Sequence, residues 1–445
     1  MMITSIRLKW GVLAGILMSL TAGLHAQESG EVWKQEVERK IDVLTKELEK
    51  SKLGPAAEPV YQSKYGFAPA AAKVYHVGRG VSLGGYGEMV LREFDNERDN
   101  GTASGSRREL DFVRAILYTG YKFNDKILFN SELEFEHGST ANSSTAQTPR
   151  GEVSVEFAYL DFMVSKPLGL RAGMVLVPMG FVNELHEPTV FHGAVRPSVE
   201  QNLIPTTWRE NGAGIHGEIG PFSYRSYVMA GLQATPAGGV SGFSASSGLR
   251  GGRSRGAKSF AEDIAWVGRV DYDGLPGTVV GGSLYTGQAG QNATVSNREV
   301  DAPVTLWEAH GQAEYRGLEL RALYAQGTVG DAALINQGMA TACTSGTCSV
   351  GERLFGGYTQ LAYNVLSVLH ASQYLAPFVR YERYDTQQKV PAGYTKSAAN
   401  SRTEYTVGLT YKPIQQVVIK GEWQDLDNQA GTGVNQVNLA LGYIF

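Results

Sequence analysis

The sequence contains few cysteines and no metal-binding pattern built on them. Only Cys343 and Cys348 occur among the 445 residues, with four residues between them. In an exported chain so close a pair favours a disulfide within one loop, and with no further Cys or His beside it a zinc site lacks ligands. We therefore expect a Cys343–Cys348 disulfide, no metal and no other cofactor.

Long apolar runs are also missing after the amino terminus. No later stretch approaches the roughly 18 consecutive apolar residues of a membrane-spanning helix. At the start, Arg7 and Lys9 precede a short apolar run at residues 11–20, and Ala26 offers a small residue for cleavage. This pattern predicts a signal peptide over residues 1–26. A membrane anchor is the alternative, but the apolar run is too short to span a bilayer comfortably.

Neither an excess of positive charge nor a catalytic motif is present. The net charge of −4 becomes −6 once Arg7 and Lys9 are removed with the leader, so nothing indicates a nucleic-acid partner. GxSxG occurs at residues 80–84, where the alternating pattern begins, and at residues 252–256, in a long polar loop, so neither has the context of a nucleophile elbow. The histidines are scattered rather than placed beside a nucleophile. An outer-membrane enzyme would need a nucleophile, a base and an orienting group. We expect no enzyme.

Residues 27–53, following the leader, are rich in Glu and Lys and carry a heptad seam. Coiled coils need such spacing, and three turns are marginal alone, so the helix would depend on an oligomer formed by the rest of the chain. A single amphipathic helix lying on the barrel or the envelope is the alternative. Residues 54–80, with several prolines and alanines, predict a linker. The seam consists of Val37, Ile41, Leu44 and Leu48.

From Val81 onward, apolar and polar residues alternate with period two, which predicts strands with one apolar face. The last segment shows this clearly, because Val437, Leu439 and Leu441 alternate with polar or small residues and the chain stops on Phe445. Strands of about ten residues suit a tilted bilayer crossing, whereas a sandwich normally uses shorter strands. The expected fold is all-β, a transmembrane antiparallel β-barrel of about 16 strands over residues 81–445.

The connections alternate between tight turns and long polar loops, as in outer-membrane barrels. Two segments do not alternate cleanly. In residues 109–122, Arg114 interrupts the apolar face in one phase and Asp111 in the other. Residues 152–164 change faces midway, which we interpret as a β-bulge.

Residues 178–209 interrupt the strand pattern and contain four prolines, so they are not expected to form sheet throughout. A long insertion at this place would be most useful folded inward, where it narrows the lumen. A solvated or subunit-facing loop is one alternative, and a metal site at His186, Glu187 and His192 is another, disfavoured by spacing and by Pro188. The candidate constriction residues are Glu184, His186, Glu187, His192, Arg196, Glu200 and Arg209.

Four motifs resemble the phosphate-selective porin O and P family: GEVSVEFAYLDF (151–162), GLRAGMVLVPMGF (169–181), NELHEPTVFHGAVRP (183–197) and IPTTWRENGAGIHGEI (204–219). The resemblance implies a trimeric sixteen-stranded barrel that passes small hydrophilic solutes. It does not extend to phosphate selectivity, because the inward Arg ladder and Lys ring of characterised members have no recognisable counterpart here.

The inward faces of the strands carry both signs of charge, which predicts weak ion selectivity. The expected function is an outer-membrane porin for small hydrophilic solutes or ions, with anions as one candidate class. The alternative is a structural protein whose barrel anchors a periplasmic coiled coil. Expected partners are outer-membrane lipid and lipopolysaccharide, two further copies of the chain, and the barrel assembly machinery, for which Phe445 would be the signal. The candidate lumen-wall residues are Glu132, Glu134, Glu136, Arg171, Arg269, Arg321 and Arg380.

Overall fold

The computed structural model describes residues 39–40, 61–139, 151–339, 343–369 and 371–445. The predicted signal peptide lies outside the described residues, and so does the predicted coiled coil except for Arg39 and Lys40. Within the described part of the chain, no helix is both long and apolar enough to span a bilayer. Residues 61–445 form one compact unit.

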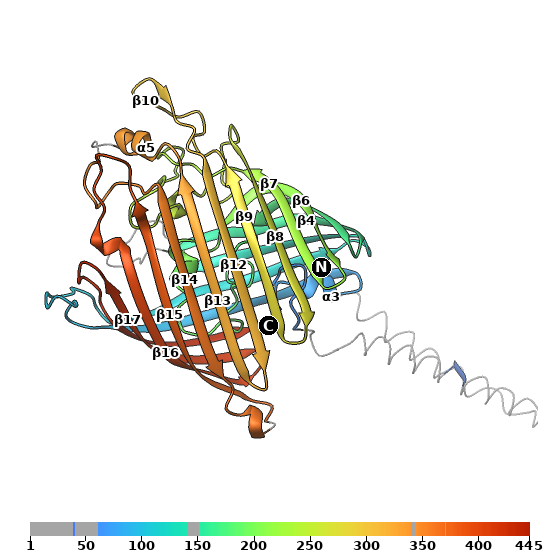
Figure 1. Ribbon diagram of the computed structural model, residues 1–445. Helices are drawn as coiled ribbons and strands as arrows, with labels where there is room; N and C mark the ends of the chain where they lie inside the picture. Colours follow the sequence, from blue (N-terminus) through green and yellow to red (C-terminus); the bar gives the residue numbers. More distant parts are fainter. Residues whose placement is uncertain (1–38, 41–60, 140–150, 340–342, 370) are drawn as a thin grey trace, which may run out of the picture. The chain divides into compact units, whose positions relative to one another are not determined.

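That unit is a closed antiparallel barrel of sixteen strands among the described residues (Figure 1). The barrel strands are β1 (Gly80–Phe94), β2 (Glu109–Lys122), β3 (Ile127–Glu136), β4 (Glu152–Ser165), β5 (Leu168–Leu176), β6 (Arg209–Ile219), β7 (Phe222–Ala230), β8 (Ile264–Leu275), β9 (Thr278–Gly287), β12 (Val304–Tyr315), β13 (Leu318–Val329), β14 (Arg353–Tyr363), β15 (Tyr374–Lys389), β16 (Ser401–Ile414), β17 (Val417–Asn428) and β18 (Gln436–Ile444).

Each strand pairs with its sequence neighbour, and β18 pairs with β1 to close the sheet, with Tyr86 opposite Ile444. Closure removes the free edges that an open sheet would present. The prediction of an all-β barrel of about 16 strands is therefore confirmed.

Short elements complete the described chain. They are α3 (Lys73–His76), α4 (Val199–Asn202), α5 (Ala332–Gly338), the 3-10 turns η1 (Arg250–Gly252), η2 (Ser367–Leu369) and η3 (Ala398–Asn400), and a separate hairpin of β10 (Thr294–Val295) and β11 (Arg298–Glu299). The segment β10 and the helix α5 lie beyond one end of the barrel, among the long loops (Figure 1). At the other end, short turns such as residues 166–167 and 316–317 join the strands.

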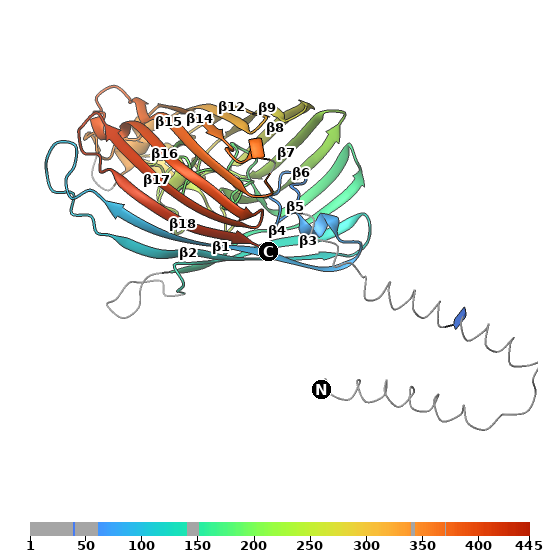
Figure 2. The ribbon, with the colours of Figure 1, turned by 90° about the horizontal axis from the view of Figure 1, so that it is seen from below.

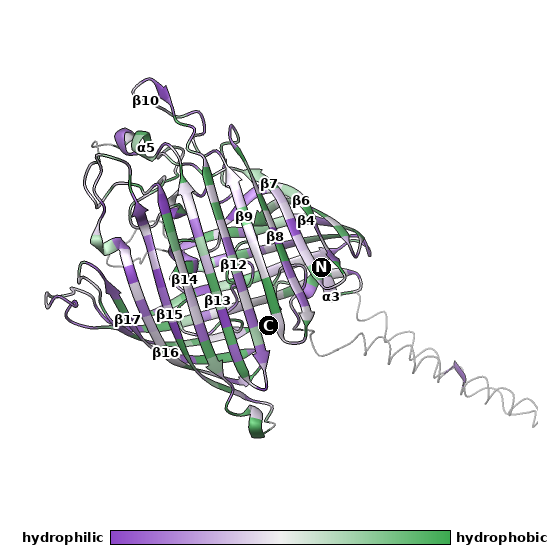
Figure 3. Ribbon diagram, viewed as in Figure 1, coloured by the Kyte–Doolittle hydropathy of each residue, from purple (hydrophilic) through white to green (hydrophobic). Residues whose placement is uncertain are grey.

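The outward face of the barrel is apolar. Val437 is 44% exposed, Leu439 53% and Leu441 40%, whereas Asn438 between them is fully buried. Hydrophobic and hydrophilic residues alternate along the strands in the same way (Figure 3). A continuous exposed surface of large apolar side chains on a closed barrel is what a lipid-facing wall requires.

β-bulges explain why residues 109–122 and 152–164 do not alternate cleanly. Opposite β2, the register shifts between Glu88 and Val90, so that Asp111 and Arg114 both find partners on β1. Between β3 and β4, Glu132 pairs with Phe157 and Leu133 with Val155. The bulge expected in residues 152–164 is thus confirmed at Glu156, which has no partner in the ladder.

Candidate functional site: the interior of the barrel

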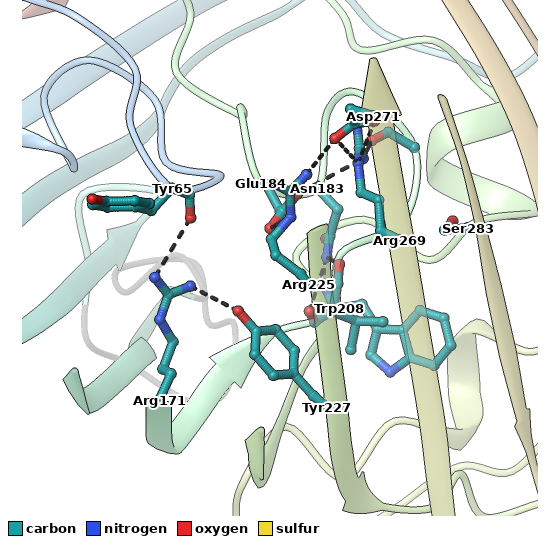
Figure 4. Close-up of polar contacts among 12 residues, drawn as sticks. Tyr65, Arg171, Asn183, Glu184, Trp208, Arg225, Tyr227, Arg269, Asp271 and Ser283 are labelled. Atoms are coloured by element: carbon teal, nitrogen blue, oxygen red, sulfur yellow. Dashed lines mark hydrogen bonds and ion pairs between the residues drawn. The ribbon is translucent and has the colours of Figure 1, made fainter. Parts of the chain in front are cut away.

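Residues 177–208, which connect β5 to β6, fold into the barrel. Their two ends are held together because Val177 N donates to Trp208 O at 2.9 Å. The Asn183 side chain strengthens this neck: its Nδ2 donates to Val177 O at 2.7 Å and to Trp208 O at 2.9 Å. Its Oδ1 accepts from Trp208 N at 2.7 Å, and Figure 4 shows Asn183 beside Trp208. We call residues 177–208 the inserted segment.

Carboxylates of the barrel wall anchor the inserted segment through its backbone. Glu422 of β17 accepts from Ala194 N at 3.0 Å and from Val195 N at 3.2 Å. Glu382 of β15 accepts from Val199 N at 3.0 Å. A proline-rich segment forms few backbone hydrogen bonds of its own, so its buried amides need such acceptors. The contacts place the inserted segment in the lumen rather than in solvent.

Two of the predicted constriction residues stabilise the inserted segment itself. Glu200 accepts from Val182 N at 2.7 Å and from the hydroxyl of Tyr358 on β14 at 2.6 Å. Arg196 donates from Nη1 to Thr206 Oγ1 at 2.8 Å. Both side chains are buried. Glu200 thus ties the segment to the wall, and Arg196 joins two parts of it.

Glu184 lies in a buried group of charges with β7 and β8 (Figure 4). Arg225 Nε lies 3.1 Å from Glu184 Oε1, and Arg225 Nη2 donates to Asp271 Oδ2 at 2.7 Å. Arg269 Nε donates to the same Asp271 oxygen at 2.8 Å. Burial raises the pKa of Glu184, and the two guanidinium groups offset this only in part. Opposite charges therefore neighbour one another instead of forming a ring of one sign.

A second buried group surrounds Asp161 of β4. Arg171 Nη2 donates to Asp161 Oδ2 at 2.9 Å, and His216 Nε2 lies 2.7 Å from Asp161 Oδ1. The hydroxyl of Tyr75 donates to Asp161 Oδ2 at 2.7 Å. Arg171 Nη1 also donates to the hydroxyl of Tyr227 at 2.9 Å (Figure 4). Tyr75 shows that a second part of the chain enters the lumen.

That part is residues 61–77, which we call the N-terminal lumen segment. Phe67, Ala72 and Val74 are buried, and α3 contacts β1, β2 and β3 near the short-turn end (Figure 2). The described part of the predicted linker, residues 61–80, is therefore largely packed against the barrel instead of forming a solvated tether. Burying its aromatic and small apolar side chains among barrel residues is more favourable in free energy than leaving them in water, as a solvated tether would.

Glu187 connects the two lumen segments. Its Oε1 accepts from Ala70 N and from Ala71 N, both at 2.9 Å, and its Oε2 lies 3.1 Å from Ala70 N. Burial raises the pKa of Glu187 to about 7, although the amides of Ala71 and Ala70 lower it in part. The carboxyl group thus satisfies two backbone donors that would otherwise be buried without an acceptor.

His186, Glu187 and His192 do not converge on one point. His186 Nε2 lies 3.1 Å from Glu132 Oε1 on β3. His192 Nδ1 lies 2.9 Å from Thr410 Oγ1, and its Nε2 lies 3.1 Å from Glu319 Oε2. The metal site considered from these three residues is therefore excluded by their separate environments.

Arg209 is the first residue of β6 rather than part of the inserted segment. Its Nη1 donates to Glu156 Oε1 at 2.9 Å, and its Nη2 donates to Ser154 Oγ at 3.0 Å.

Burial lowers the pKa of His186, but the charge and hydrogen bond of Glu132, helped by Glu156, raise it overall. Charges of both signs therefore meet where the inserted segment contacts the β3–β4 wall.

The remaining predicted wall residues also face inward. Arg380 Nε donates to Glu382 Oε1 at 2.8 Å, and Arg321 Nη2 donates to Val190 O at 3.4 Å. Glu134 is buried, and Glu136 ends β3. Sequence reasoning missed several interior charges that the same alternation could have identified, namely Asp161, Arg225, Asp271 and Glu382, and it also missed Glu156, which lies at the bulge.

Water-sized space remains beside both lumen segments. A cavity of about 420 Å³ is lined by Lys64, Glu184, Arg225 and Asp271, among others. A smaller one of about 120 Å³ is lined by charged residues that include Arg196. The interior thus contains polar space next to the charged groups described above.

Two predicted features lie outside the lumen. Cys343 and Cys348 form a disulfide, with their Cα atoms 5.8 Å apart. Phe445 N donates to Gly85 O at 2.9 Å, and Gly85 N donates to Phe445 O at 3.0 Å. The last residue therefore extends the β1–β18 pairing while its ring stays 47% exposed.

The barrel resembles solved outer-membrane porins. It aligns with OmpF of Salmonella typhi, solved in complex with daunomycin, at a TM-score of 0.53 and 11% identity, over 83% of this chain and 98% of that chain. It aligns with the anion-selective porin from Comamonas acidovorans at a TM-score of 0.50 and 14% identity, over 82% and 99%. At such identities the likeness shows a shared porin fold.

No family model matches the chain, so the similarity to the phosphate-selective porin O and P family remains a hypothesis. An uncharacterized protein of Aquifex aeolicus (strain VF5) is 39% identical over 365 residues, covering 82% of this chain and 79% of that protein. The chain therefore belongs to the same protein family as this Aquifex aeolicus protein.

Proposed function

We propose that the protein is an outer-membrane porin, a water-filled channel for passive diffusion of small hydrophilic solutes and ions. The observation that carries this proposal is a closed barrel with an apolar outer face and a charged interior. A soluble barrel would bury its apolar face, whereas a membrane barrel exposes it to lipid. A catalytic role has no comparable support, because the charged groups around Asp161 and Asp271 pair with one another.

The proposed channel is narrow, because two segments occupy its lumen. The inserted segment supplies the constriction, and the N-terminal lumen segment covers part of the short-turn end. Charged rings in a pore select ions by sign, but here Arg171 lies against Asp161 and Arg225 against Asp271. Such pairing supports weak charge selectivity, with anions as one candidate class.

The same proposal places the protein in the bacterial outer membrane, with the residues before the barrel in the periplasm. A homotrimer, contacts with lipid and lipopolysaccharide, and insertion by the barrel assembly machinery through the Phe445 signal belong to it. The four motifs quoted above support kinship with the phosphate-selective porin O and P family. Preference for phosphate is not proposed.

Conductance in planar bilayers tests the channel. The purified protein should insert in discrete conductance steps, in groups of three for a trimer. Arg196→Gln keeps a donor for Thr206 but removes a lumen charge, so it should shift the reversal potential in a salt gradient toward cations. Arg316→Gln, at an exposed turn, should leave it unchanged. A silent bilayer with firm cell-wall binding would contradict the proposal and favour the structural anchor.

A further inference from the structure

Three buried side chains from separate elements meet inside the barrel: Glu132 of β3, Glu156 of β4 and His186 of the inserted segment. Each offers one ligand atom, and the three atoms lie within 4.8 Å of one another. Glu132 and Glu156 are fully buried, and His186 is 2% exposed. Two buried carboxylates need positive charge beside them to be stable, and Arg209 pairs with only one of them, Glu156.

The orientation of His186 directs one ring nitrogen at both carboxylates. Its Nδ1 lies 2.9 Å from Asn183 O, and a carbonyl oxygen only accepts, so Nδ1 carries a proton and donates. In the neutral ring, Nε2 then has a free lone pair. It lies 3.1 Å from Glu132 Oε1 and 3.6 Å from Glu156 Oε2. A histidine whose second nitrogen donates to a carbonyl is the usual arrangement of a metal ligand.

The β-bulge brings the second carboxylate into place. Regular alternation along β4 would direct Glu156 and Phe157 to opposite faces. Because Glu132 pairs with Phe157 and Leu133 with Val155, Glu156 is the extra residue, and both Glu156 and Phe157 are fully buried. Bulges re-aim side chains in this way next to functional sites.

Polar atoms at this place lack partners. Among the described residues, Glu132 Oε2 and Glu156 Oε2 are buried without a hydrogen bond, and so are the hydroxyls of Tyr86 and Tyr118. Tyr118 lies directly opposite Glu132 in the β2–β3 ladder. The ring centroids of Tyr86 and His186 are 6.1 Å apart. Arg209 satisfies only Glu156 Oε1. An unpaired buried carboxylate oxygen is costly, so this group of atoms is suited to a further cation.

Two of the three distances between the ligand atoms are near those around one ion, and the third is below 4.8 Å. Ligand atoms about 2.1 Å from one metal, at octahedral or tetrahedral angles, lie about 3.0–3.4 Å apart. The Nε2–oxygen distances of 3.1 and 3.6 Å are close to this range. We propose that Glu132, Glu156 and His186 bind one divalent transition-metal ion of the Zn²⁺ type, which fastens the inserted segment to the β3–β4 wall. The imidazole ligand favours such an ion over Ca²⁺ or Mg²⁺.

Zn²⁺ binding to the full-length, detergent-solubilised protein tests this site. After treatment with a chelator and dialysis, calorimetric titration with Zn²⁺ should show one site per chain, and Ca²⁺ should not compete. Co²⁺ as a second probe should give a visible absorption spectrum. His186→Asn and Glu132→Gln should each weaken Zn²⁺ binding by at least about tenfold.

His192→Asn is the matched control, because His192 is buried in the same segment but contacts Thr410 and Glu319. It should bind Zn²⁺ like the unmodified protein. If His186→Asn fails to fold, Glu132→Gln decides, since it leaves the shape of the site unchanged. Absence of Zn²⁺ binding would mean that His186 is only a protonated partner of the carboxylates and would overturn the site. The site would also be overturned if His186→Asn and Glu132→Gln both bound Zn²⁺ as tightly as the unmodified protein. A silent bilayer would not bear on this result, because binding is measured in detergent.

Discussion

Replacing Glu187 by Ala should release the N-terminal lumen segment. The carboxylate accepts from two buried amides, Ala70 N and Ala71 N. A buried donor left without an acceptor costs about 1–3 kcal/mol, so the two together cost about 2–6 kcal/mol. At 1.4 kcal/mol per factor of ten, the docking equilibrium should shift by about 30-fold to 10⁴-fold toward the undocked state.

Other contacts oppose release, so undocking is expected to be partial. Asn130 Nδ2 donates to Ala71 O at 3.0 Å, Lys122 Nζ donates to Val77 O at 2.9 Å, and Tyr75 remains bonded to Asp161. Limited trypsin digestion measures the change, because cleavage after Lys73 requires the segment to leave the lumen. Mass spectrometry should find this cleavage faster in Glu187→Ala than in the unmodified protein, and single-channel recordings should show a larger or noisier current.

Glu422→Ala is the matched control. Glu422 also accepts from two successive amides of the inserted segment, Ala194 N and Val195 N, and its hydrogen-bond partners among the described residues lie in that segment and at Asn438, not in residues 61–77. Cleavage after Lys73 should therefore stay slow in Glu422→Ala. The reasoning fails if Glu187→Ala is cleaved at the unmodified rate, or if Glu422→Ala accelerates cleavage equally.

Three further predictions concern the ends of the barrel and one buried histidine. Deleting Phe445 should lower the amount of folded barrel in the outer membrane more than it destabilises purified protein; normal membrane levels on semi-native gels would contradict this. Deleting residues 27–53 should preserve single-channel conductance and lower only the temperature at which the proposed trimer dissociates; loss of the channel would contradict the proposed role. Burial lowers the pKa of His192, opposed by Glu319 and helped by Arg321 and Lys412. A lowered pKa disfavours proton uptake by the folded protein, so stability should fall as the pH drops below about 6.5, and the loss between pH 8 and pH 5 in thermal unfolding should be smaller in His192→Gln.

The alternation of the sequence predicted which face of most strands points outward, with residues 109–122 and 152–164 as exceptions. Period-two placement follows directly from strand geometry, and Val437, Leu439 and Leu441 are exposed as expected. The four prolines of residues 178–209 likewise predicted a non-strand insertion. Both conclusions depend only on the types of residues that are neighbours in the sequence.

Contacts across the lumen could not be predicted in this way. Periodicity places Glu132 and Asp161 inward, but it does not reveal that His186 reaches the first and Tyr75 the second. Residues 61–77 belong to the predicted linker of residues 54–80, because prolines and alanines suit a tether as well as a packed segment. Their position depends on Glu187, which is more than 100 residues away.

Fluorescence quenching by brominated lipids tests the central claim most directly. Trp423 is 44% exposed on the outer face of β17, and Trp208 is fully buried inside the barrel. In liposomes, a variant that retains only Trp423 should be quenched strongly by brominated acyl chains, and one that retains only Trp208 should not. Strong quenching of Trp208 together with an unaffected Trp423 would contradict a barrel whose apolar face meets lipid and whose polar face encloses water.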